Sequence, residues 1–179
     1  MVEWGHRIHG FRYASLRYFN AAGATGERGE NHSPEEQLIP VLLQTAAGQR
    51  KSISIVETDY PTRDKTCIRD YIHVSDLSRA HLLAFDRLGR DREAESLIYN
   101  RKTAEGITVR EVVETVTRLA KHPIPVQECA RSPGHPPVLV ASSEKLKLDL
   151  GWEPKHSRLE ELIAGAWTWR QQHPEGYTR

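Results

Sequence analysis

Three glycines at a spacing of three residues, Gly23, Gly26 and Gly29, form the first pattern in this chain that could do chemistry. A glycine-rich turn lets the backbone approach the phosphates of a dinucleotide, provided that the turn follows a strand and opens a helix. These glycines belong to the loop that follows the strand pattern at 13–19. We therefore do not expect them to hold a dinucleotide.

Nine histidines and two cysteines raise the question of a metal site. His6 and His9 are three residues apart, but no cluster of acids or cysteines joins them. Cys67 and Cys129 form no CxxC pair and are too few for a disulfide framework. The sequence predicts surface histidines and no metal site.

The composition excludes several classes of protein. Apolar residues make up 38% of the chain and charged residues 27%, and the formal net charge is +1. A nucleic-acid-binding protein needs many cationic contacts with phosphates, so no nucleic-acid partner is expected. No apolar stretch approaches the roughly 18 residues that a membrane span needs, and the N-terminus lacks the pattern of a signal peptide. We expect one globular domain, or a small domain with pieces of another, in the cytoplasm.

Strand and helix patterns alternate along the chain, which favours an α/β fold. Short apolar or alternating runs predict strands at 13–19, 52–56, 97–99 and 124–126. Apolar stripes with helical spacing predict helices that start at Ser33, Ser75, Thr108, Ser143 and Ser157. Ser33–Glu36 and Thr108–Glu111 both have the spacing of a capping box.

The predicted strand at 13–19 lacks obvious partners. In an α/β domain such a strand is parallel to its neighbours and covered on both faces. The rest of the chain does not obviously supply those neighbours, and an open edge would favour aggregation. We therefore expect the chain to be part of a longer protein.

Three stretches of the chain resemble UDP-glucose 4-epimerases of the extended short-chain dehydrogenase/reductase superfamily. They are Leu16–Ala24, Asp59–Leu77 and Gly134–Lys145, the last followed by Leu150–Pro154. The resemblance continues to His173–Tyr177 and so covers nearly the whole chain.

In that family an N-terminal Rossmann domain holds NAD, and a Tyr-x-x-x-Lys pair supplies the base that acts on the sugar 4-hydroxyl. Neither the NAD-binding glycine turn nor this pair is found in the sequence. The resemblance implies that 1–30 are the residual end of the Rossmann domain and that 31–179 form the smaller α/β region that binds the UDP-sugar, with short returns to the Rossmann part. We expect a Rossmann-type sheet edge, no catalytic residue, and NAD binding only in an intact enzyme.

The resemblance also assigns contacts with the UDP-sugar to residues from several segments. They are Asn20, Gln37, Leu38, Ser54, Ile55, Val56, Arg69, Tyr71, Arg131, His135 and Leu139. It places Tyr18 and Phe19 near the nicotinamide of NAD, although core packing would explain these two rings as well.

Arg69 is the strongest expected ligand of the diphosphate, because a guanidinium can bind phosphate through two parallel hydrogen bonds. The alternative role for Arg69 is a salt bridge with Asp70 or another nearby acid. Asn20 is expected at the diphosphate region, Gln37 and Leu38 at the nucleotide, and 54–56 beside the uracil. Tyr71 could support the same side of the substrate pocket as Arg69.

Several positions depart from the family pattern. Ser132 stands where a second arginine normally binds phosphate, and His135 stands where an aspartate usually holds the ribose. A hydroxyl cannot replace a bidentate cation, although Arg131 could compensate in part. Glu57 and Lys65 stand where glycine is common, and the glycine-rich turn at 100–106 retains only its last glycine. Leu139 occupies the position beside the sugar, where a residue smaller than tyrosine leaves room for UDP-GlcNAc as well as UDP-glucose and UDP-galactose.

Two hypotheses follow. In the first, the chain is the substrate-binding part of an epimerase whose N-terminal half is missing from the sequence record or is made as a separate chain. In the second, it is a non-catalytic remnant that binds nucleotide sugar weakly or not at all. A third hypothesis, an interaction module, is weaker, because the family forms dimers through helices of the N-terminal domain.

Overall fold

A computed structural model gives the fold of residues 1–56, 59–90, 97–100, 106–129, 134, 136–140 and 143–177. Its helices are α1 (Val2–His9), α2 (Leu38–Ala46), α3 (Val74–Arg90), α4 (Val109–Ala120), α5 (Glu144–Leu150) and α6 (Leu159–Gln172). Its strands are β1 (Ala14–Arg17), β2 (Asn20–Ala22), β3 (Ile53–Val56), β4 (Ile68–Arg69), β5 (Tyr71–His73), β6 (Leu97–Asn100), β7 (Ile107–Thr108), β8 (Val126–Cys129) and β9 (Val138–Leu139).

The described strands form four small sheets. The parallel pairs are β1 with β6, β2 with β5, β3 with β8, and β4 with β9, while β4 and β7 are antiparallel. At least one helix lies between the two strands of every pair along the chain. Parallel pairing across helical connections is the α/β architecture that the alternating sequence patterns predict.

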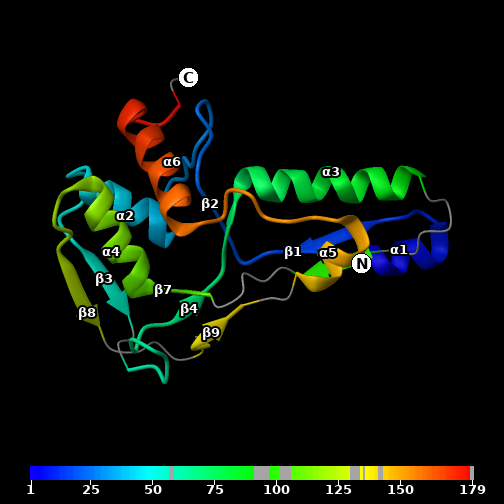
Figure 1. Ribbon diagram of the computed structural model, residues 1–179, viewed down its shortest axis with the longest axis horizontal. Coiled ribbons are helices and arrows are strands. Elements are labelled where there is room, and N and C mark those ends of the chain that lie inside the picture. Colours follow the sequence, from blue (N-terminus) through cyan, green and yellow to red (C-terminus); the bar gives the residue numbers. More distant parts are fainter. Residues whose placement is uncertain are drawn as a thin grey trace.

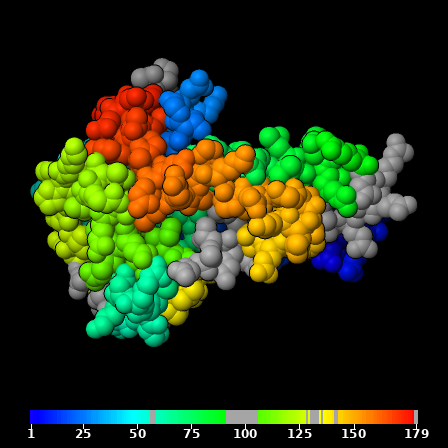
Figure 2. Space-filling view, in the orientation of Figure 1, coloured from blue at the N-terminus to red at the C-terminus, as the bar shows by residue number. Residues whose placement is uncertain are grey.

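The molecule is elongated, with helices grouped at its two ends (Figure 1). At one end α2, α4 and α6 lie beside β3 and β8. At the other end α3, α5 and α1 lie along β1. The segment between α5 and α6 crosses the surface from one group to the other (Figure 2).

The main core joins α2, α4 and α6 to β3 and β5. Its fully buried members include Leu42, Val112 and Leu162, each with none of its surface exposed. Burying an aliphatic side chain stabilises a fold by about 1.5–3 kcal/mol. The three helices therefore form the best-packed part of the molecule.

A second, smaller core lies between α3 and α5. Ile72, Ala80, Leu146 and Trp152 are its buried members. The indole N–H of Trp152 donates to the carbonyl oxygen of Asp76 at 3.0 Å, so this core also fixes the start of α3. No helix in the described residues is both long enough and apolar enough to traverse a bilayer.

The structure confirms one predicted capping box and corrects the other. Thr108 accepts a hydrogen bond from the Glu111 N–H, and the Glu111 side chain accepts one from the Thr108 N–H. The helix predicted from Ser33 instead begins at Leu38, with Gln37 as its N-cap. The Glu35 carboxylate turns toward the chain that follows it and accepts a hydrogen bond from the Gln37 N–H at 2.9 Å.

Other helix starts differ less from the prediction. Ser143 is the N-cap of α5, and Gly151 ends that helix in the left-handed conformation. Ser75 lies inside α3, and Ser157 precedes the N-cap Arg158 of α6. The Ser157 hydroxyl donates to the Asp76 carboxylate and accepts from the His73 N–H at 3.1 Å, so it does not cap the helix.

The predicted strand at 13–19 forms as β1, and β6 is its neighbour. The expectation that the chain supplies no neighbour for this strand is therefore wrong for one edge. Among the strands that the structure describes, none pairs with the other edge.

Candidate functional site

Residues 68–73 run from β4 into β5 and pair with different strands in each half. In the first half Arg69 is the partner of Leu139 in β9 and of Ile107 in β7. In the second half Tyr71 is the partner of Asn20 in β2. This segment thus brings four predicted substrate-binding residues to neighbouring positions.

Arg69 is half-buried and held by main-chain oxygens. Its Nη1 donates to the carbonyl oxygens of Ile68 at 2.9 Å and Pro136 at 3.1 Å. Within the described residues no carboxylate forms an ion pair with it, so the salt bridge with Asp70 that the sequence allowed is not formed. A guanidinium has five N–H donors, and the bonds at Nη1 orient it without neutralising its charge.

Asn20 and Tyr71 are fixed in different ways. The Asn20 amide donates to the carbonyl oxygen of Asp70 at 3.0 Å, which ties β2 to the bend between β4 and β5. Tyr71 is 5% exposed and belongs to the main core. Burial raises the pKa of its phenol far above the ordinary value, so Tyr71 is a neutral side chain of the core.

The residues predicted at the nucleotide lie on β3 and at the start of α2. Ser54 is exposed, whereas Ile55 is buried, as successive residues of a strand point to opposite faces. Val56 pairs with Cys129 through the backbone, and its side chain lies outside the described part. Gln37 is exposed at the N-cap of α2, and Leu38 packs against the main core.

Four further predicted residues belong to two groups. Arg131 and His135 fall outside the described residues. Tyr18 and Phe19 follow β1 and are 45% and 47% exposed, so core packing does not account for either ring. The Tyr18 ring meets the His81 ring edge-on at a centroid distance of 6.4 Å.

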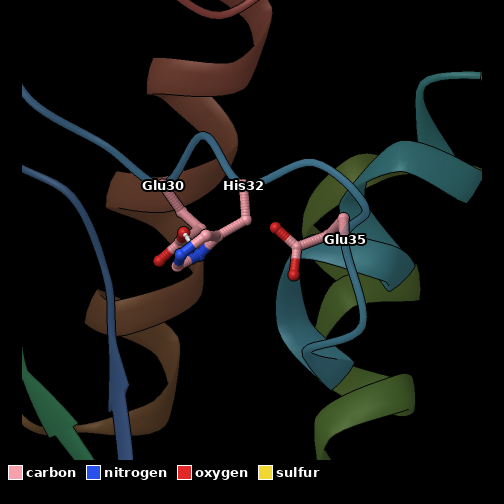
Figure 3. Close-up of side chains that lie close together, drawn as sticks. All are labelled: Glu30, His32 and Glu35. Atoms are coloured by element: carbon pink, nitrogen blue, oxygen red, sulfur yellow. Dashed lines mark ion pairs between the residues drawn. The ribbon is translucent and has the colours of Figure 1, made fainter.

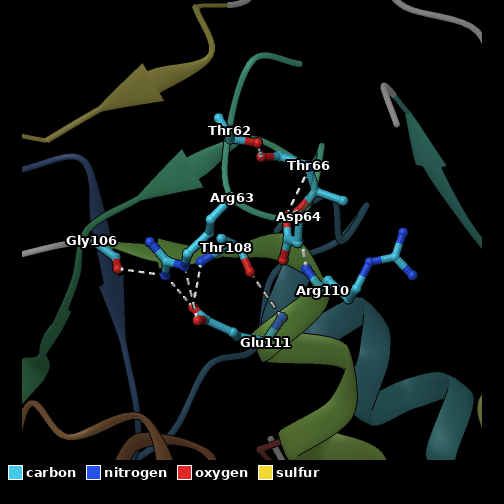
Figure 4. Close-up of polar contacts among 8 residues, drawn as sticks. All are labelled: Thr62, Arg63, Asp64, Thr66, Gly106, Thr108, Arg110 and Glu111. Atoms are coloured by element: carbon cyan, nitrogen blue, oxygen red, sulfur yellow. Dashed lines mark hydrogen bonds and ion pairs between the residues drawn. The ribbon is translucent and has the colours of Figure 1, made fainter. Parts of the chain in front are cut away.

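A polar network that the sequence did not reveal holds the segment in front of β4 (Figure 4). Arg63 donates to both carboxylate oxygens of Glu111, at 3.1 and 2.5 Å, and to the carbonyl oxygen of Gly106 at 3.0 Å. Glu111 also accepts from the Thr108 N–H at 2.8 Å. Although burial opposes the charged form, these hydrogen bonds and the nearby Arg63 charge hold the pKa of Glu111 below its ordinary value.

The same network contains a turn around Asp64. The carboxylate accepts hydrogen bonds from the N–H and the hydroxyl of Thr66, at 2.9 and 2.7 Å. Thr66 in turn accepts from the Arg110 N–H at 3.3 Å. Burial opposes ionisation of Asp64, but hydrogen bonds from Thr108 and Thr66 outweigh it and lower its pKa. These residues belong to the structure that positions Arg69.

One cavity of the described residues does not coincide with the predicted site. It has a volume of about 560 Å³ and lies between the loop 21–30 and the starts of α2 and α3. Trp169 and Arg170 of α6 also line it. Of the predicted residues only Gln37 reaches this cavity. Arg28, Arg79 and Arg170 line it, so a second group of cations lies outside the paired strands that carry Arg69.

The glycine pattern at 23–29 is largely explained by packing. A Cβ on Gly23 would lie 2.4 Å from the His73 ring, and a Cβ on Gly29 would lie 2.2 Å from the Trp169 ring. The loop does not open a helix directly, since α2 begins at Leu38. The described residues therefore do not fit a dinucleotide-phosphate cradle.

Comparison with known proteins places the chain in a family. A family profile described as GDP-mannose 4,6 dehydratase matches residues 1–165. The chain belongs to this family. Within the family, it is 47% identical over 180 residues to UDP-glucose 4-epimerase of Halalkalibacterium halodurans, covering 99% of this chain and 53% of that protein.

Comparison with solved structures also finds UDP-glucose 4-epimerases. A crystal structure of UDP-glucose 4-epimerase matches with a TM-score of 0.94 and 45% identity, covering 100% of this chain and 54% of the other. The epimerase of Bifidobacterium longum, in complex with NAD⁺ and UDP, matches with a TM-score of 0.88 and 31% identity, covering 98% and 52%. These matches confirm the resemblance to UDP-glucose 4-epimerases. The chain spans about half the length of the curated relatives it matches.

Proposed function

We propose that this chain supplies the nucleotide-sugar-binding half of a UDP-glucose 4-epimerase and is inactive without an NAD-binding half. The observation that carries the proposal is the alignment of nearly the whole chain with about half of the epimerase relatives. In this proposal, residues 1–30 are the end of the Rossmann domain and 31–179 form the UDP-sugar-binding region.

The proposed binding surface rests on the family resemblance, and the strand pairing supports it at Asn20, Arg69 and Leu139. Arg69 and Asn20 bind the diphosphate, Ser54–Val56 flank the uracil, and Gln37 and Leu38 contact the nucleotide from the start of α2. Helix N-termini favour anions, which supports the last placement. Leu139 lies beside the sugar and leaves room for UDP-GlcNAc as well as UDP-glucose and UDP-galactose.

The NAD-binding half has to come from a partner segment. No tyrosine of the chain is followed by a lysine four residues later, so the family's proton acceptor is not supplied here. Tyr18 and Phe19 would face the nicotinamide once that half is present. Cys67 and Cys129 form no disulfide with each other, which fits a reducing compartment, and we propose the cytoplasm.

A second candidate is a non-catalytic remnant that binds nucleotide sugar weakly or not at all. Ser132 and His135, which replace an arginine and an aspartate of the family pattern, favour it. Losing a charge-assisted contact costs about 1.5–3 kcal/mol.

Calorimetry with UDP tests the binding surface. Because only part of the site is present, we expect a Kd no tighter than about 0.1 mM, or roughly −5.5 kcal/mol. Arg69→Ala should weaken any measured binding at least about tenfold, whereas Arg118→Ala on the exposed face of α4 should not. A micromolar Kd, or equal affinity of the two variants, would contradict the assignment.

Complementation separates the two candidates. The chain is mixed with the N-terminal half of the Halalkalibacterium halodurans epimerase, NAD and UDP-galactose, and UDP-glucose is measured. Turnover only in the mixture supports the proposal. A mixture that assembles in sedimentation but stays inactive supports the remnant, and turnover by the chain alone would refute both.

A further inference from the structure

Three side chains with metal-ligand chemistry meet in the loop before α2. One donor atom each from Glu30, His32 and Glu35 lies within 4.8 Å of the other two (Figure 3). This cluster lies apart from the strands that carry Arg69, and sequence spacing did not reveal it.

Glu35 distinguishes this cluster from an ordinary group of exposed acidic side chains, because Glu35 is buried. It is 5% exposed, and its Oε1 accepts from the Gln37 N–H at 2.9 Å. Its Oε2 is buried and has no hydrogen-bond partner among the described residues. Leaving a buried carboxylate oxygen unpaired is costly, and in Figure 3 the carboxylate points toward His32.

The nearest cation does not satisfy this oxygen. The Arg50 guanidinium donates to the main-chain oxygen of Glu35 at 2.9 Å and to the Gln44 side chain at 2.6 Å. His32 and Glu30 lie on the side toward which the Glu35 carboxylate points (Figure 3), so a cation held there would pair with the open oxygen.

His32 and Glu30 supply two movable ligands. The His32 Nδ1 lies 2.5 Å from the Glu30 Oε1, and the two side chains are 73% and 40% exposed. The Gly29 backbone is held by two hydrogen bonds with the Tyr177 hydroxyl, at 3.0 and 3.1 Å. The loop is thus anchored beside the cluster, while the outer two side chains are held to each other and exposed to solvent.

We propose that Glu30, His32 and Glu35 bind a divalent transition-metal ion of the zinc class. Imidazole and carboxylate together suit Zn²⁺, and three protein ligands leave a fourth position for water. Donors bound to one tetrahedral ion lie about 3.4 Å apart, so rotation has to separate the His32–Glu30 pair from 2.5 Å and bring both donor atoms toward Glu35. The Gln37 N–H orients Glu35 from outside, as is usual for a metal-binding carboxylate.

Zinc titration of the whole chain against a chromophoric chelator tests the site. Glu35→Gln keeps the acceptor for the Gln37 N–H, and His32→Ala changes an exposed residue, so both variants should fold. Each should bind Zn²⁺ at least about tenfold more weakly than the unaltered chain. Glu36→Gln and His122→Ala, which change an exposed neighbouring acid and a distant exposed histidine, are the matched controls.

The outcomes are distinct. Loss of affinity in the first two variants, with both controls unchanged, supports the site. Equal affinity in all four variants would mean that zinc binds other surface histidines and would overturn the proposal, as would the absence of measurable zinc binding. None of these outcomes depends on UDP or NAD.

Discussion

Asp76 illustrates how one buried charge fixes distant segments. The residue is 1% exposed, and its carboxylate accepts hydrogen bonds from the Lys155 N–H, the His156 N–H and the Ser157 hydroxyl at 2.8–2.9 Å. Burial would raise its pKa, but these hydrogen bonds outweigh burial and lower it. The start of α3 is thereby attached to the segment that precedes α6.

Replacing Asp76 by Asn should destabilise the fold by about 1–3 kcal/mol near neutral pH, because an amide NH₂ would face backbone donors. The pKa of Asp76 is lower in the folded than in the unfolded state. Its contribution is therefore complete above the unfolded value of about 3.9 and is lost as the pH falls through the depressed value. Urea unfolding of both proteins, followed from about pH 7 to about pH 3, should show the difference shrinking in acid.

Asp86→Asn is the control for this measurement. Asp86 lies on the same helix and forms an exposed ion pair with Arg90 at 3.2 Å, a type of pair that contributes about 0–1 kcal/mol. Equal losses for the two variants would show that burial and hydrogen bonding at Asp76 are not the cause.

Among the elements, β7 lies against β4 because a glycine precedes it. Gly106 has a φ of 67°, and a Cβ there would lie 2.4 Å from the Ile68 Cγ2. The left-handed conformation and the close approach of Ile68 both exclude a side chain. Since Arg69 follows Ile68, this contact also sets the position of the expected diphosphate ligand.

Gly106→Ala should therefore cost more than the φ penalty alone. Gly48 is the matched control, because its φ is 76° and nothing lies within 4 Å of a Cβ built there. We expect Gly48→Ala to cost about 1–2 kcal/mol and Gly106→Ala to cost clearly more in urea unfolding. Equal costs would mean that Ile68 moves aside freely.

Local sequence signals predicted an element well where the residues that stabilise it are close together in the sequence. The capping box at Thr108 formed as expected, and Lys65, which stands where glycine is common, does adopt a positive φ of 67°. The strands β2, β4, β5, β7 and β9 were not predicted, since each has only two or three residues and is defined by a distant partner. The Ser33 helix start failed because Glu35 turned into the interior.

The candidate site was predictable to a similar extent. Resemblance named Asn20, Arg69 and Leu139, and the strand pairing then brought them together. The link between Arg63 and Glu111 joins residues 48 positions apart, so neither spacing nor composition could reveal it. The same holds for the cluster around Glu35, where the decisive observation is burial.

At the scale of the whole molecule, large apolar side chains are exposed on the elements at one end. Trp4 and Ile8 of α1 are 66% and 52% exposed, and Leu82 and Phe85 of α3 are 66% and 75% exposed. Exposed apolar surface of this kind marks interaction sites or aggregation-prone surfaces. Its position beside the open edge of β1 fits a proposed partner half that packs there.

The isolated chain should therefore self-associate through this end. A Leu82→Lys/Phe85→Lys double variant should lower the weight-average mass measured by sedimentation equilibrium, because two charges would oppose burial of this face. Val126→Lys is the control, since Val126 is 37% exposed on β8 at the opposite end. A chain that is monomeric at every concentration, or a double variant that associates as strongly, would refute the expectation.

The strand pairing has a consequence for the rate of folding. No described sheet contains a hairpin, since a helix separates the members of every pair along the chain. Each sheet forms only after a long stretch of chain has closed on itself, and topologies dominated by such distant contacts fold slowly. The helices are expected to form before any sheet is complete. During that interval unpaired strands of different molecules can aggregate, and a low protein concentration or a chaperone reduces this aggregation.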